Sequence, residues 1–65
     1  MNGDDEVTGE EILFASARAR GVREGRTGAD TYASVRELES APGRAVLLAG
    51  YLEGLAVARR RAVAR

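Results

Sequence analysis

The sequence predicts an all-α fold built from a small three-helix unit, and three observations carry that prediction. Apolar side chains recur at helical spacing in two long stretches and one short one. No stretch shows the alternation of apolar and polar residues that is typical of a half-buried strand. Loop-forming residues separate the three stretches, with Gly-Arg-Thr-Gly at 25–28 and Ala-Pro-Gly at 41–43.

The first helix is predicted over residues 9–24. Thr8 is expected at the N-cap and Glu11 at N3, which together form a capping box. Val7 and Ile12 have the spacing of a hydrophobic staple around that cap. Gly25 is expected to end the helix as its C′ residue, because glycine adopts the left-handed conformation needed there.

The first helix is apolar on two sides. One stripe consists of Ile12, Ala15, Ala19 and Val22. The opposite side carries Leu13, Phe14, Ala17 and Gly21. Because alanine is so frequent on both sides, close contacts between helices are expected.

The second helix is short and is predicted over residues 29–40. Thr27 or Asp30 is expected to cap it. Its apolar stripe is Tyr32, Val35 and Leu38, with Ala33 beside it.

Pro42 is expected to break or kink the chain, because proline cannot donate a backbone hydrogen bond into a preceding turn. Alternatively, Ser40 caps the third helix and places Pro42 in its first turn, where proline is tolerated. A second fold therefore stays open, a helical hairpin in which the middle and last helices form one rod kinked at Pro42.

The third helix, over residues 45–63, is apolar on more than one side. One stripe consists of Leu48, Leu52 and Leu55, and a second strip of Leu47, Gly50, Gly54 and Ala58. A helix that is apolar nearly all round needs neighbours on several faces. A chain of 65 residues cannot easily supply them, so we expect it to self-associate as a helical-bundle homodimer.

The two glycines inside the third helix indicate where that contact forms. Together they cost the helix roughly 1–2 kcal/mol, which close approach of another helix would offset. The expected contact surface is Leu47, Gly50, Tyr51, Gly54, Leu55 and Ala58. The competing interpretation is that the glycines face the short helix inside one chain.

The net charge is zero, yet the charges are unevenly spread, with acids gathered at the start of the chain. All ten basic residues are arginines, and most lie near the ends of the two long helices. Candidate phosphate contacts are Arg18, Arg20, Arg23, Arg26, Arg59, Arg60 and Arg61. If the long helices are parallel, the two clusters meet; if they are antiparallel, nearby acids neutralise them.

Catalysis has little basis in this composition. The chain contains no His, no Cys and no Lys, so no imidazole, thiol or amine is available as a base or nucleophile. Serines and threonines are present but lack such a base. We therefore assign no catalytic, cofactor-binding or metal-binding residues.

Residues 1–7 are expected to form an acidic flexible tail, and residues 8–65 a single helical domain. The sequence shows neither a signal-peptide pattern nor an apolar run long enough for a membrane span, so a cytoplasmic protein is expected. The predicted function is a small non-enzymatic protein-interaction module, of the inhibitor, adaptor, antitoxin-like or phage-type regulator kind. The alternatives are a nucleic-acid-binding transcriptional regulator that uses the arginine clusters, and a structural subunit of a larger assembly.

Overall fold

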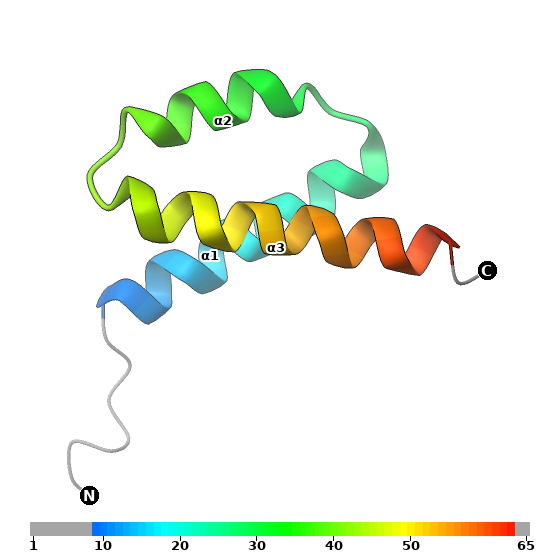
Figure 1. Ribbon diagram of the computed structural model, residues 1–65, viewed down its shortest axis with the longest axis horizontal. Helices are drawn as coiled ribbons and strands as arrows, with labels where there is room; N and C mark the ends of the chain where they lie inside the picture. Colours follow the sequence, from blue (N-terminus) through cyan, green and yellow to red (C-terminus); the bar gives the residue numbers. More distant parts are fainter. Residues whose placement is uncertain (1–8, 64–65) are drawn as a thin grey trace, which may run out of the picture.

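The computed structural model describes residues 9–63, in which three helices and no strands are found. They are α1 (Gly9–Thr27), α2 (Thr31–Glu39) and α3 (Arg44–Val63), which confirms the all-helical fold with a short middle helix. Figure 1 shows α2 running back above the other two, so α1 and α3 point the same way. The alternative of one rod kinked at Pro42 is wrong, because the chain reverses between α2 and α3. The capping-box partner Thr8 and the staple residue Val7 lie outside the described residues.

Helix α1 ends three residues later than the sequence predicts. Gly28, with φ of 75°, is the left-handed residue after the helix, and its N–H donates to the Glu24 carbonyl at 3.0 Å. Gly25 stays inside the helix, so its prediction as the C′ residue is wrong. Gly25 remains helical because it packs against α3, where a Cβ on Gly25 would lie 2.8 Å from the Cβ of Ala58.

The two ends of α2 resolve the alternatives for its caps. The Asp30 carboxylate accepts from the Ala33 N–H at 3.2 Å, so Asp30 is the N-cap. Ser40 is the C-cap of α2, and the interpretation that it caps the third helix is wrong. Pro42 lies in the turn before α3, and the Gly43 carbonyl accepts from the Leu47 N–H at 3.0 Å.

Helices α1 and α3 make the main contact of the fold, and they make it through small residues. Each helix carries three at a spacing of four: Ala17, Gly21 and Gly25 on α1, and Gly50, Gly54 and Ala58 on α3. A Cβ added to Gly50 would lie 2.5 Å from the Phe14 carbonyl oxygen. The two backbones therefore approach closely, as at small-residue crossings between membrane helices.

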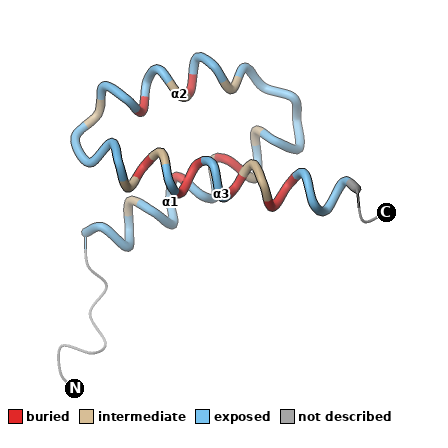
Figure 2. The backbone as a smooth tube through the Cα atoms, in the orientation of Figure 1, coloured by how far each residue is buried: buried red, intermediate tan, exposed pale blue. Residues whose placement is uncertain are grey.

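Helix α2 packs mainly on α3 and completes the core. The buried cluster is Ala17, Leu38, Leu47 and Tyr51, with Leu13, Val35, Ala41, Leu48 and Leu55 partly buried around it. Figure 2 shows the buried positions gathered where α1 and α3 cross, with others on α2. The Tyr51 ring is fully enclosed, with 0% of its surface exposed.

Several large apolar side chains remain outside this core. Ile12 is 57% exposed and Leu52 is 55% exposed. The predicted leucine stripe of α3 is therefore split, since Leu48 and Leu55 are half-buried while Leu52 is not. None of the helices in the described range is both long enough and apolar enough to cross a membrane.

Candidate functional site

The predicted contact strip of α3 lies inside a single chain. Its members Leu47, Gly50, Tyr51, Gly54 and Ala58 are buried, and Leu55 is half-buried. The glycines face α1 and not the short α2, because the backbone of α1 is what an added Cβ would meet. The strip is thus used within the chain, and a partner could reach it only if α1 moved away.

The parallel arrangement of α1 and α3 brings the two arginine clusters to one end of the molecule (Figure 1). There an open groove of about 670 Å³ is lined by Arg18, Ala19, Val22, Arg23, Arg26, Thr27 and Arg61. Arg61 comes from α3 and the others from α1. We call this feature the arginine groove.

The other three candidate arginines lie elsewhere. Arg20 points toward α2, where it contacts Ser34 and Glu37. Arg59 lines a separate hollow of about 250 Å³ beside the turn between α1 and α2. Arg60 is exposed on α3. The structure therefore brings together four of the seven predicted arginines.

The cations of the groove are weakly neutralised. Arg18 Nε lies 4.0 Å from Glu53 Oε2, and both side chains are almost half exposed, so this pair contributes little. Within residues 9–63, Arg23, Arg26 and Arg61 form no ion pair. The groove is consequently a local concentration of positive charge on a chain with zero net charge.

An apolar stripe runs into this groove along α1. Ile12, Ala15 and Ala19 are exposed, and Val22 is half-buried. At about 100° per residue the four side chains fall within a sector of about 80°. We call this stripe, together with Arg18, Arg23 and Arg26, the outer face of α1.

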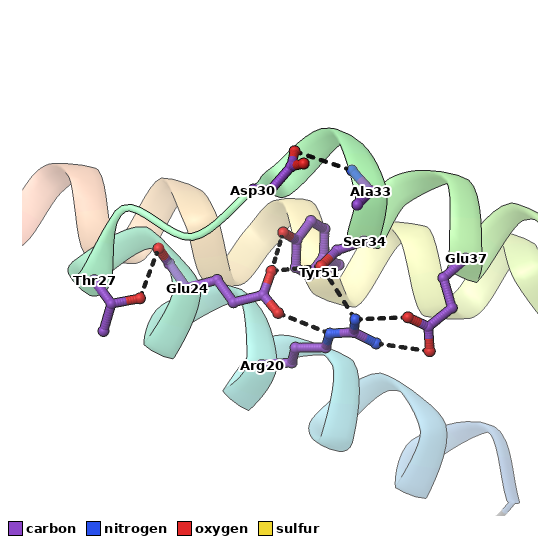
Figure 3. A network of polar contacts seen from close by, with 8 residues as sticks. All are labelled: Arg20, Glu24, Thr27, Asp30, Ala33, Ser34, Glu37 and Tyr51. Atoms are coloured by element: carbon purple, nitrogen blue, oxygen red, sulfur yellow. Dashed lines mark hydrogen bonds and ion pairs between the residues drawn. The ribbon is translucent and has the colours of Figure 1, made fainter.

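A polar clasp, formed by Arg20, Glu24, Ser34, Glu37 and Tyr51, lies on the opposite side of α1. The Glu24 carboxylate accepts from Tyr51 Oη at 2.6 Å and from Ser34 Oγ at 2.7 Å. Arg20 Nε donates to the second Glu24 oxygen at 3.0 Å, and the same guanidinium reaches Glu37 Oε1 at 2.9 Å. Figure 3 shows that these contacts tie the three helices together.

The clasp fixes the charge of its central carboxylate. Hydrogen bonds from Tyr51, Ser34 and Arg20 lower the pKa of Glu24 to about 2. Burial, followed by the neighbouring carboxylate, raises the pKa of Tyr51 above its usual value. A carboxylate this acidic is a weak base, and the Ser34 hydroxyl that donates to it is itself buried. The clasp is therefore suited to holding the helices together.

Sequence reasoning missed the clasp because its members are far apart along the chain. Glu24 contacts Ser34 and Tyr51, which belong to two other helices, and no spacing along the chain predicts these contacts. The one available signal was the hydroxyl of Tyr51 in an apolar stretch, since a buried tyrosine needs a polar partner.

No protein-family model matches the sequence, and comparison with curated proteins and with solved structures gives no significant match.

Proposed function

We propose that this chain is a small non-enzymatic interaction module, and that its contact surface is the outer face of α1. The observation that carries the proposal is an apolar stripe, flanked by arginines, that lies exposed on a firmly held helix. Apolar side chains gathered in this way on the surface of a small domain are typical of interaction sites.

The rest of the molecule supports this assignment by holding α1 in place. The glycine crossing fixes one side of α1 against α3, and the polar clasp fixes its neighbouring side against α2. The outer face is thus presented on a preformed scaffold, which lowers the entropic cost of binding. An inhibitor, adaptor, antitoxin-like or phage-type regulator would work in this way, and so would a structural subunit.

Site-specific photo-crosslinking in cells tests the assignment. Benzoylphenylalanine replaces Ser16, which is exposed at the edge of the stripe, or Ala33, which is exposed on α2 as the control. We expect a macromolecular adduct from position 16 that is lost when Arg23 and Arg26 are changed to glutamate. Equal adducts from both positions, or adducts from position 33 alone, would contradict the assignment.

A second candidate function, nucleic-acid binding in the arginine groove, is favoured by the convergence of Arg23, Arg26 and Arg61. The zero net charge of the chain weighs against it. If the groove binds nucleic acid, changing Arg23, Arg26 and Arg61 together to glutamate should abolish binding to a short DNA duplex. The affinity of the wild-type chain for that duplex should fall steeply as the salt concentration rises. The matched control is Arg36→Glu with Arg44→Glu, both exposed and away from the groove.

A further inference from the structure

We infer that the partner of the outer face of α1 is a second copy of this chain, packed antiparallel through its own outer face. The inference rests on the proposed function, because it takes that face to be the contact surface. Three features of α1 support it: the order of its apolar residues, the distribution of its charges, and the position of the arginine groove.

The apolar stripe has the same pattern in both directions. Ile12, Ala15, Ala19 and Val22 follow one another at spacings of three, four and three, with the β-branched residues outside and the alanines inside. A two-fold interface pairs the same patch on both copies, so that residue i meets j while j meets i. An antiparallel pair centred near Ala17 places Ile12 level with Val22 of the other copy, and Ala15 level with Ala19.

The side-chain sizes suit this pairing. Two alanines at the centre let the two helix backbones approach closely, as the glycines already allow inside the chain. Ile12, which is 57% exposed, would then be covered by the end of the partner stripe. The contact would use a surface that the fold leaves open and would disturb none of the core.

The charges of α1 favour the antiparallel direction. Glu10 and Glu11 lie in its first turn, Arg18 lies at its midpoint, and Arg23 and Arg26 lie toward its end. A parallel pair would set acids beside acids and arginines beside arginines. An antiparallel pair sets the acidic turn of each copy against the end of α1 that carries Arg23 and Arg26 in the other copy, which favours the antiparallel direction over the parallel one.

The arginine groove gives that charge pairing a defined place. On the helical wheel Glu11 lies between the directions of Arg18 and Val22, about 20° from each. A two-fold axis perpendicular to both helices places the same side of each α1 next to that side of the other copy. Glu11 of the second copy therefore lies on the side of the interface that carries the arginine groove. Arg61 of α3 lines that same groove. A carboxylate would thereby enter a site whose arginines are otherwise poorly neutralised.

Light scattering of the purified chain over a range of concentrations is the first test. We expect a dimer for the wild type, and for Ala19→Arg a dissociation constant raised by about tenfold or more, with helix content unchanged by circular dichroism. The control Ala49→Arg, at an exposed position of α3, should leave the dimer intact. A monomer at every concentration, a dimer indifferent to Ala19→Arg, or equal dissociation by Ala49→Arg would each overturn the inference.

Engineered cysteines test the direction, since the native chain has none. Ile12 and Arg23 lie within about 20° of each other on the wheel, and in the antiparallel pair Arg23 is only one residue, about 1.5 Å, away from the level of Ile12 of the other copy. Mixing Ile12→Cys chains with Arg23→Cys chains should therefore give the mixed disulfide, whereas either variant alone should stay reduced. Homodisulfides of a single variant would indicate a parallel pair and overturn the inference.

The experiments distinguish a failure of this inference from a failure of the proposed function. A monomeric protein that crosslinks from position 16 to a foreign protein or to nucleic acid would refute the second copy as partner, yet retain the outer face as a contact surface. A dimer that forms without crosslinking from position 16 would contradict both proposals.

Discussion

Gly21 of α1 and Gly54 of α3 face each other backbone to backbone where the two helices cross. A Cβ built on Gly54 would lie 2.9 Å from the Gly21 Cα, and one built on Gly21 would lie 3.1 Å from the Gly54 Cα. Real side chains are rarely found so close to a neighbouring backbone. The position of α1, and with it the direction of its outer face, therefore depends on these two residues having no side chain.

Gly54→Ala is expected to destabilise the fold although alanine favours a helix by about 1 kcal/mol over glycine. The new methyl would meet the carbonyl oxygen of Arg18 and lie 2.8 Å from the Val22 nitrogen. Such overpacking costs about 1–3 kcal/mol or more, and rigid backbone gives way less easily than a side chain. Urea unfolding should show a lower midpoint.

The matched control for this crossing is Gly9→Ala, because a Cβ at Gly9 meets nothing within 4 Å. Its midpoint should stay the same or rise slightly. If Gly54→Ala were as stable as this control, the close crossing of α1 and α3 would not exist in solution.

The stability of the fold should depend on acid pH through Glu24. Its pKa is about 2 in the folded chain, against an ordinary value of 4.5. The stabilisation is therefore complete above about pH 4.5 and is lost as the pH falls toward 2, where the folded carboxylate takes up its proton. Unfolding measured between pH 7 and pH 2 should show this loss.

Glu24→Gln serves as the comparison for the acid series. It should be less stable than the wild type at pH 7, by about 1–3 kcal/mol, because charged hydrogen bonds to Tyr51, Ser34 and Arg20 are lost or weakened. It should also lose less stability on acidification. Parallel pH profiles for the two proteins would rule out Glu24 as the source of the acid sensitivity.

Substitutions of Arg20 and Arg23 should affect different properties, the first the stability of the fold and the second the binding of a partner. Arg20→Met should lower thermal stability, because it removes the guanidinium that joins Glu24 to Glu37 and Ser34. Arg23→Met should leave thermal stability nearly unchanged and weaken partner binding, since Arg23 is exposed in the groove. Melting temperature and the dimer dissociation constant, measured on both variants, check the two expectations. The reverse pattern would mean that the clasp and the groove have been assigned the wrong roles.

Asp30 should matter to α2 through its capping bond to the Ala33 N–H. Asp30→Ala is expected to cost about 1 kcal/mol, and Asp30→Asn much less, because an amide oxygen can accept the same bond. Chemical unfolding of both variants measures the difference. Equal losses would show that the charge of Asp30 matters and not its capping geometry.

Local features of the structure could be predicted from the sequence. The three helices, the cap at Asp30 and the break at Pro42 follow from residues that lie next to one another along the chain. The end of α1 was harder to predict, because Gly25 and Gly28 are both suitable C′ residues for the helix. The contact of Gly25 with Ala58 keeps it helical, and that contact depends on a helix more than thirty residues further along.

Features that depend on how the helices meet could not be predicted in the same way. The small residues of α3 indicated close packing but not its partner, which is the matching strip on α1. Arg20 and Arg23 are only three positions apart in the sequence, and both suggest phosphate binding. Side chains three residues apart on a helix differ by only about 60° in direction around its axis, so small differences in where α2 and α3 pack decide which arginine is enclosed.

The crossing of α1 and α3 also sets the order in which this protein can fold. Gly21 and Gly54 are about thirty residues apart in the sequence, and the main contact of the fold joins α1 to α3. A ribosome-bound chain that has exposed only α1 and α2 lacks the surface on which both pack, so the tertiary structure of this unit must wait until α3 has emerged. Closing so long a loop is costly, and we expect slower folding than for helical proteins of this size whose contacts are local.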